Sequence, residues 1–170
     1  MITCKFIFMK TPEISIKPLQ TEEEIKACAA IMANTSPWTI LNIRAKQIEQ
    51  TLRDNFYESY VAYAGDAIAG VAVIQLKGVC TGYLKSIAVK KEFRKNHIGS
   101  LLMDHIEKRI LSVHPNVFLC VSSFNHDAKK FYLKRGYEEI GIIKDYLVKG
   151  YDEILMRKST GPVLAHTEKN

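Results

Sequence analysis

Residues 84–102 read LKSIAVKKEFRKNHIGSLL and pass from the pattern of a strand to that of a helix. We expect the strand to end at Val89, and apolar residues recur at helical spacing from Ile98 onward. The basic loop between them leads into a helix N-terminus, whose unpaired N–H groups and dipole favour a phosphate group. Arg94 and Lys95 add positive charge to this loop. An ordinary solvent-exposed basic loop is the alternative interpretation.

Residues 125–137 read NHDAKKFYLKRGY and predict a helix directly after a buried strand. Asn125 is a residue type that caps helices, and its amide could also reach a ligand. Tyr132 lies seven residues further on, so it returns to nearly the same helix face. Its hydroxyl can donate a proton, although an aromatic residue at this spacing is more often part of a core. Gly136 is placed to end the helix.

The rest of the sequence predicts an α/β fold in which helices cover a mixed sheet. Residues 21–24 match a capping box, and Gly65 and Asp66 suit a tight turn between two strands. We expect a strand over 14–18, helices over 22–34 and 43–53, strands over 57–63, 68–76 and 83–89, a helix over 98–114, a strand over 117–121, a helix over 126–135, and strands over 137–144 and 151–156.

Length and composition fit one globular domain. The chain has 170 residues, of which 47% are hydrophobic and 25% charged, so disordered and fibrous classes are excluded. We expect a single domain over residues 1–158, with a short strand or ordered arm within residues 1–8, and a flexible polar tail over residues 159–170. The sequence shows no apolar run of the roughly 18 residues that a membrane helix needs and no signal peptide, so we expect a cytoplasmic protein.

The cysteines and charges exclude some kinds of site. Cys4, Cys28, Cys80 and Cys120 are too far apart for a CxxC metal or redox pair. Cys28 and Cys120 have apolar neighbours and are predicted to be buried free thiols. The histidines lack the spacing of metal ligands, so no metal site is expected. The net charge of +6 favours anionic partners in general, whether nucleic acid, headgroups or phosphorylated cofactors.

Together, the two quoted stretches resemble the GNAT superfamily of N-acetyltransferases. The acyl-CoA motif of that family, Gln/Arg-x-x-Gly-x-Gly/Ala, aligns with Arg94, His97 and Gly99. Its second motif, Asn-x-x-Ala-x-x-Phe-Tyr-x-x-x-Gly-Phe/Tyr, is matched throughout from Asn125 to Tyr137. The resemblance covers most of the chain and implies a GNAT-like fold, with a central, mostly antiparallel sheet of about six to seven strands flanked by four helices.

The resemblance also implies a site for acetyl-CoA and its transfer to an amine in a ternary complex. Backbone groups of Ile87, Ala88 and Val89 would pair with the pantetheine arm, and the Ile87 N–H would polarise the thioester carbonyl. The pyrophosphate would bind to backbone N–H groups of the loop, namely those of Arg94, Lys95, Asn96, His97, Ile98, Gly99 and Ser100.

The same resemblance implies roles for three side chains of the second motif. Asn125 would contact the cofactor arm, and Lys134 would reach the far end of the cofactor. Tyr132 would bind the cofactor and protonate the departing thiolate as general acid. On the acceptor side, Tyr83 and Trp38 are the candidate substrate-binding residues, with Trp38 either forming a wall of an amine pocket or holding its loop against the core.

Two positions depart from the family pattern. His97 stands where the motif has glycine, so we expect negative φ there or a shifted loop. Many relatives carry a carboxylate on the strand before the loop to deprotonate the amine, but Tyr83 and Lys85 occupy that part of this chain. The base is therefore unassigned, with Glu58 and Asp66 as candidates that are equally well explained as surface acids.

Several functions stay open at this point. The leading hypothesis is an N-acetyltransferase for a small-molecule or peptide amine, and a protein N-terminal acetyltransferase is the nearest alternative. A non-catalytic acyl-CoA-binding module is a second class, because a strand carboxylate is missing. A nucleic-acid-binding protein ranks last, since only the net charge suggests it. A homodimer is left open.

Overall fold

The computed structural model describes residues 12–79 and 81–167, and the strand or arm expected within residues 1–8 lies outside them. The strands are β1 (Ile14–Pro18), β2 (Tyr57–Ala64), β3 (Ala67–Gln75), β4 (Tyr83–Val89), β5 (Asn116–Ser122), β6 (Glu138–Val148) and β7 (Tyr151–Ser159). The helices are α1 (Glu22–Ala33), α2 (Ala45–Arg53), α3 (Ile98–Leu111), α4 (His126–Lys134) and α5 (Val163–Thr167). Every strand and helix predicted between residues 14 and 156 is therefore present.

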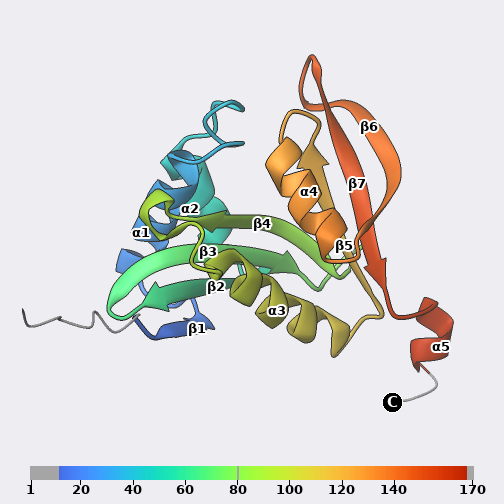
Figure 1. The fold of residues 1–170 in the computed structure, drawn as a ribbon, viewed down its shortest axis with the longest axis horizontal. Coiled ribbons are helices and arrows are strands. Elements are labelled where there is room, and N and C mark those ends of the chain that lie inside the picture. The colour runs from blue at the N-terminus through green and yellow to red at the C-terminus, as the bar shows by residue number, and fades with distance from the viewer. Residues whose placement is uncertain (1–11, 80, 168–170) are drawn as a thin grey trace, which may run out of the picture.

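The strands form one seven-stranded sheet with helices on both faces (Figure 1). Their order is β1-β2-β3-β4-β5-β7-β6, and of these neighbouring pairs only β4–β5 is parallel. The mixed, mostly antiparallel sheet expected from the sequence is confirmed.

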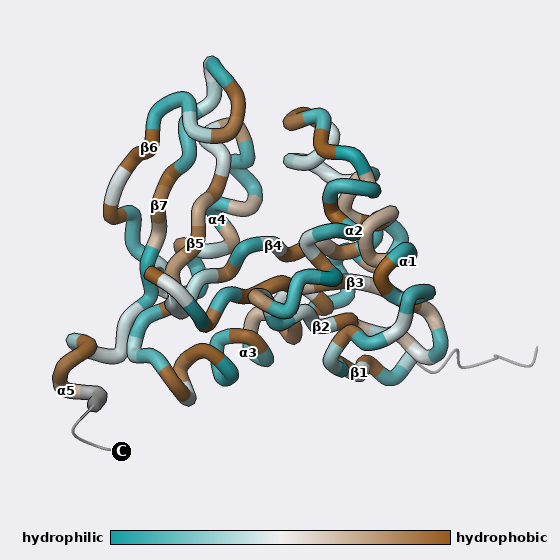
Figure 2. Tube along the Cα trace, turned by 180° about the vertical axis from the view of Figure 1, so that it is seen from behind, coloured by the Kyte–Doolittle hydropathy of each residue, from teal (hydrophilic) through white to brown (hydrophobic). Residues whose placement is uncertain are grey.

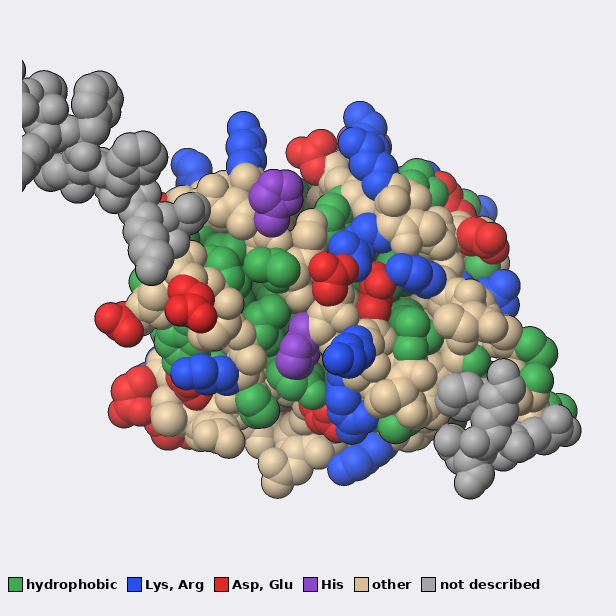
Figure 3. All heavy atoms as spheres, turned by 60° about the horizontal axis from the view of Figure 1, so that its bottom comes forward, with side chains coloured by type: hydrophobic (Ala, Val, Ile, Leu, Met, Phe, Trp, Pro, Cys, Tyr) green, Lys and Arg blue, Asp and Glu red, His purple; other side chains and the backbone are tan. Residues whose placement is uncertain are grey.

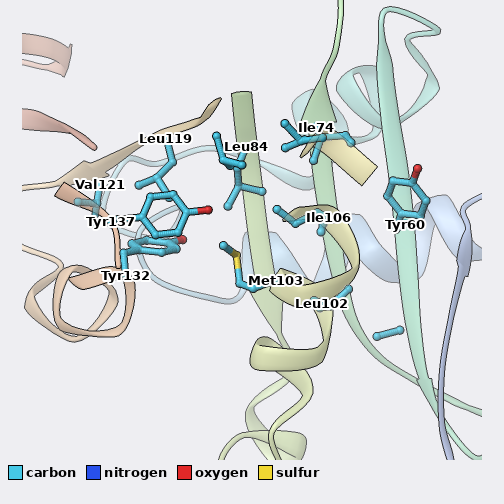
Figure 4. Close-up of a cluster of buried hydrophobic side chains, with 14 of the residues drawn as sticks. Tyr60, Ile74, Leu84, Leu102, Met103, Ile106, Leu119, Val121, Tyr132 and Tyr137 are labelled. Atoms are coloured by element: carbon cyan, nitrogen blue, oxygen red, sulfur yellow. The ribbon is translucent and has the colours of Figure 1, made fainter. Parts of the chain in front are cut away.

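Two hydrophobic cores lie on opposite faces of the sheet. On one face, α1 and α2 cover β2 to β4, where Cys28 and Met32 pack in a cluster with Val61 and Val71. On the other face, α3 packs across the centre of the sheet, and α4 covers β5 and β7. Figure 4 shows Met103 of α3 close to the side chains of β5 and α4. Neither α1 nor α2 reaches over β5 and β7, so no helix of the described residues lies against one face of these two strands.

β4 and β5 are paired at two positions only. Tyr83 lies opposite Phe118 and Leu84 opposite Leu119, and beyond these pairs the two strands diverge. The register of β4 against β3 shifts at Lys85, and such a bulge bends a strand and strengthens its twist. Figures 1 and 2 show the two halves of the molecule fanning apart from this junction, with α1, α2 and β1–β4 in one half and α4 and β5–β7 in the other.

Charged residues are interspersed on the face shown in Figure 3, where Lys and Arg side chains lie among Asp and Glu. Ion pairs connect α3 to its neighbours: Arg109 is 2.6 Å from Glu58 of β2, and Arg135, which follows α4, is 2.6 Å from Asp104. Within residues 12–79 and 81–167, no helix is long and apolar enough to cross a bilayer.

One expectation, the burial of Cys120, needs correction. Cys28 is fully buried, as predicted, but Cys120 is partly exposed, because it lies on the face of β5 that no helix covers. In the stretch over residues 159–170, whose flexibility stays a prediction, β7 continues to Ser159 and the helix α5 follows. β7 continues because its last residues pair with the start of β5, Ser159 lying opposite Asn116.

Candidate active site

A cleft of about 1790 Å³ opens where β4 and β5 diverge. Both halves of the molecule line it: the loop between α1 and α2 and strand β4 on one side, and β5, the start of α4 and the β6–β7 hairpin on the other. The cleft therefore brings together segments that are far apart in the sequence, including both stretches that carry the motifs.

The hydrogen-bond pattern of β4 shows which of its backbone groups face the cleft. The Lys90 N–H donates to the Ala69 carbonyl over 2.8 Å, and β4 keeps this register back to Ser86. In an antiparallel pair, alternate residues bond to the partner strand, so Ser86, Ala88 and Lys90 direct their N–H groups to β3. Ile87 and Val89 therefore direct theirs to the other edge, where β5 has already diverged.

Two residues of the loop after β4 have a left-handed backbone conformation, although neither is a glycine. Lys95 has a φ of 66° and His97 a φ of 59°. Of the two alternatives expected at His97, negative φ is therefore wrong, since the backbone holds here the conformation that glycine adopts freely, and a shifted loop stays a prediction. Within the part of the chain that the structure describes, no side chain caps the helix that begins at Ile98, and the N–H groups of its first turn have no partner within the helix. The loop thus ends in an open donor site for an anion.

The start of α3 also leaves room for close approach of a ligand. A Cβ atom built on Gly99 meets only Val89 Cγ2, at 3.7 Å, which is ordinary contact. A second hollow of about 300 Å³ lies beside it, and among its lining residues are Arg94, Lys95 and Ser100. Two residues predicted to bind the cofactor line neither hollow, namely Asn96 and Lys134.

Asn125, the residue before α4, and Tyr132 of α4 both line the cleft. The Oδ1 atom of Asn125 accepts a hydrogen bond from the Ala128 N–H over 3.4 Å, which confirms the predicted cap and leaves the side-chain NH₂ group for another partner. Tyr132 packs edge-on against Tyr137, as Figure 4 shows. Burial raises the pKa of the Tyr132 phenol above its usual range, so this hydroxyl carries its proton at neutral pH.

The predicted acceptor residues lie further along the same cleft. Trp38 belongs to the core beneath α1 and α2 and is 9% exposed, with its accessible part lining the cleft. It therefore both holds its loop against the core and forms part of the cleft wall. Tyr83 is hydrogen-bonded to Cys120 of β5, and burial raises the pKa of its phenol. Lys85 lies with its Nζ 5.1 Å from the ring centre of Tyr57.

Neither acid proposed from the sequence as a base lies in the cleft. Glu58 accepts hydrogen bonds from Arg109 and from Tyr60, at 2.6 and 2.7 Å, and lies outside the cleft lining. Asp66 occupies the turn between β2 and β3, also outside it. The cleft contains instead Glu153 of β7, which is 3% exposed. The sequence carried one signal for it, an acid at the start of the apolar strand segment 153–156.

Comparisons with known proteins agree with this geometry. The sequence profile of the acetyltransferase (GNAT) family matches residues 21–137. An uncharacterized N-acetyltransferase of Bacillus subtilis, YvbK, is 31% identical over 97 residues, which are 56% of this chain and 63% of that protein. An N-alpha-acetyltransferase of Sulfurisphaera tokodaii is 32% identical over 77 residues, 44% of this chain and 46% of that protein. The matches thus span about half to two thirds of these relatives.

Solved structures show the same fold. A putative GNAT-family acetyltransferase from Desulfovibrio desulfuricans superposes with a TM-score of 0.76 at 16% identity, over 88% of this chain and all of that one. An aminoglycoside 6'-N-acetyltransferase complexed with coenzyme A superposes with a TM-score of 0.70 at 19% identity, over 87% and 98% of the two chains. With the profile covering more than half of the sequence, the chain belongs to the acetyltransferase (GNAT) family.

Proposed function

We propose that the protein transfers an acetyl group from acetyl-CoA to a primary amine of a small molecule or peptide, by direct attack in a ternary complex. One observation carries this proposal: the edge of β4 at Ile87 and Val89 faces a cleft that is also lined by the uncapped start of α3 and by Tyr132. The strand edge suits the amide groups of an extended ligand, and the helix start suits the pyrophosphate of the same ligand.

The residues present fit acetyl-CoA, because each part of the ligand finds a matching group. The N–H and C=O groups of Ile87 and Val89 are oriented to pair with the pantetheine arm, as a further strand would. The first turn of α3 offers unpaired N–H groups to the pyrophosphate, and Gly99 lets that group approach the backbone. Bound there, acetyl-CoA supplies an activated acyl group to the cleft. A coenzyme A complex is known for a protein of the same fold.

Two groups of the chain act on the thioester in this proposal. The Ile87 N–H donates to the carbonyl oxygen and stabilises the negative charge that develops there during attack. Tyr132 donates its proton to the departing sulfur, because its phenol is protonated at neutral pH.

A protein N-terminal acetyltransferase is the second candidate, and the matched N-alpha-acetyltransferase favours it. A peptide N-terminus would enter between the α1–α2 loop and the β6–β7 hairpin, both of which line the cleft. The two candidates differ in acceptor, since the second modifies peptides and not free amines.

Thermal unfolding with acetyl-CoA tests the site, with ATP as the anion control. At about 100 times its dissociation constant, a ligand stabilises by roughly 2.7 kcal/mol, which for this size raises the melting temperature by about 5–10 °C. We expect that rise with acetyl-CoA and not with ATP, and then transfer to members of a panel of free amines and peptides. Equal rises would indicate a general anion site, and binding without transfer to any acceptor would indicate a non-catalytic module.

A further inference from the structure

Glu153 is a buried carboxylate whose only hydrogen bond among the described residues comes from a neighbouring hydroxyl. It lies opposite Ser122 in the β5–β7 pair, and the Ser122 Oγ–H donates to its Oε1 over 2.6 Å. No described lysine or arginine forms an ion pair with it. A buried acid without a cation is costly to keep in a fold, so its placement calls for a function.

The carboxylate lies on the face of β7 that none of the described helices covers. Ile154 and Met156 of the same strand point into the core shared with α3 and α4, so Glu153 and Leu155 point the other way and line the cleft. Ser122 and Cys120 of β5 line it from the same face. The surrounding polar groups are therefore Ser122, Cys120, Tyr83 of β4 and Tyr146 of the β6–β7 hairpin, and Tyr83 is close enough to Glu153 for the two to interact electrostatically.

The strand register places Glu153 near the proposed thioester. β4 and β5 run parallel from the pair Tyr83–Phe118, and four residues further along lie Ile87 and Ser122. The bulge at Lys85 takes up one residue of β4, so at about 3.3 Å per step Ile87 lies about level with Val121, one residue before Ser122, on opposite sides of the cleft. Glu153, opposite Ser122, therefore lies within about one residue of the level at which the Ile87 N–H would hold the acyl carbonyl.

We propose that Glu153 is the general base of the acetyl transfer, an inference that rests on the proposed function. Its carboxylate takes one proton from the ammonium group of the acceptor, and the freed lone pair forms the C–N bond to the acyl carbon. The C–S bond breaks with its electrons on sulfur, which takes the proton of Tyr132. The nitrogen gives its second proton to the Tyr132 oxygen, leaving the amide, the thiol of coenzyme A and protonated Glu153.

The pKa of the Glu153 carboxyl also supports this role. Burial raises the pKa of the Glu153 carboxyl, partly opposed by the hydrogen bond from Ser122. A carboxylate with a raised pKa is a stronger base near neutral pH than an exposed one. Among the described residues that line the cleft, the other carboxylate is Asp127, which is exposed in the first turn of α4.

The test is the pH profile of E153Q beside wild type, with one amine that wild type acetylates. General bases contribute about 10²–10⁴-fold, so we expect kcat/KM of E153Q at pH 7 to fall at least about 100-fold. The wild-type profile should level off above the pKa of Glu153, whereas that of E153Q should keep rising with pH toward the pKa of the amine. The acetyl-CoA melting shift should be unchanged, which shows that the variant is folded and binds.

Two further variants distinguish the loss of a general base from a structural disturbance of the β6–β7 hairpin. E139Q makes the same chemical change on β6, outside the cleft, and should keep wild-type kinetics. S122A removes the hydrogen bond that lowers the pKa of Glu153, so the acidic limb of the profile should move to higher pH. Wild-type rate and profile in E153Q would overturn this inference alone. Acetyl-CoA binding without transfer by the wild type would overturn the proposed function and this inference with it.

Discussion

Glu107 of α3 and Lys158 of β7 form an ion pair of 2.7 Å that ties the central helix to the second half of the sheet. The same carboxylate accepts hydrogen bonds from Arg135 Nε at 3.1 Å and from the Tyr137 hydroxyl at 3.2 Å. Glu107 is 7% exposed. A single buried acid therefore joins α3 to the segment that follows α4 and to β7.

Substitution E107A should destabilise the fold strongly. Removing one partner of a buried ion pair leaves the others without compensation, which costs about 3–5 kcal/mol. In a domain of this size that lowers the melting temperature by about 6–20 °C. Thermal unfolding measures it, with E58A as the comparison, since Glu58 pairs with Arg109 at the surface and its loss should cost about 1 kcal/mol or less.

Substitution Y132F should lower turnover and leave cofactor binding nearly intact. The ring packs against Phe131 and Tyr137, and these contacts survive the loss of the hydroxyl. We expect kcat to fall about 10²-fold or more and the acetyl-CoA dissociation constant to change by no more than a few fold. Steady-state kinetics with binding titration measure both, and unchanged kcat would remove Tyr132 from the role of acid.

Substitution G99E should abolish acetyl-CoA binding without unfolding the protein. The added Cβ atom has room beside Val89, but the carboxylate brings negative charge to the site proposed for the pyrophosphate. G99A is the matched control, because it adds the same Cβ atom without the charge and should bind normally. Full binding by folded G99E would show that the loop is misassigned.

The stability of variants at residue 97 should depend on how well the new residue tolerates a left-handed backbone conformation. H97G removes the strain of a left-handed residue, so stability should stay equal or rise by up to about 1 kcal/mol. H97V places a β-branched residue at φ 59°, where it fits poorly, and should lower stability by about 1–3 kcal/mol and weaken acetyl-CoA binding. Melting curves with and without acetyl-CoA measure both effects, and equal behaviour of the two variants would contradict the explanation.

Substitution E153Q should raise stability at neutral pH. The pKa of Glu153 is higher in the folded than in the unfolded state, so folding favours the protonated carboxyl. The wild type therefore loses stability as pH rises through the folded-state pKa, and E153Q does not. The melting temperature of E153Q should exceed that of wild type at pH 7, and the difference should shrink toward pH 4. A lower melting temperature of E153Q at pH 7 would contradict this assignment of charge.

The sequence predicted the elements well where local signals determine them. β4 has the predicted bounds, and the capping box of α1 is formed by Thr21 and Glu24, with hydrogen bonds of 3.1 and 2.8 Å. α2 begins at Ala45 rather than near residue 43, because Ile43 bonds back to the Trp38 carbonyl and stays in the loop.

Features of the site that depend on packing between distant segments could not be predicted from the sequence. Glu153 enters the site because β7 pairs with β5 and turns its uncovered face to β4, and neither relation follows from the residues around it. The backbone at His97 is set by the loop as a whole, whereas the expectation rested on the preference of one residue type. The two acids considered from the sequence, Glu58 and Asp66, lie outside the cleft, whereas Glu153 lines it.

The two-pair junction of β4 and β5 has a consequence for turnover in a cell. Strands β1–β4 and β5–β7 each form an antiparallel half-sheet, so beyond the pairs Tyr83–Phe118 and Leu84–Leu119 the inner edges of β4 and β5 are not paired with each other. If the pantetheine arm pairs with β4 as proposed, acetyl-CoA acts as a strand that the polypeptide lacks. Local opening, and with it proteolysis, would then slow as acetyl-CoA rises, which makes the lifetime of the protein a measure of the acetyl supply.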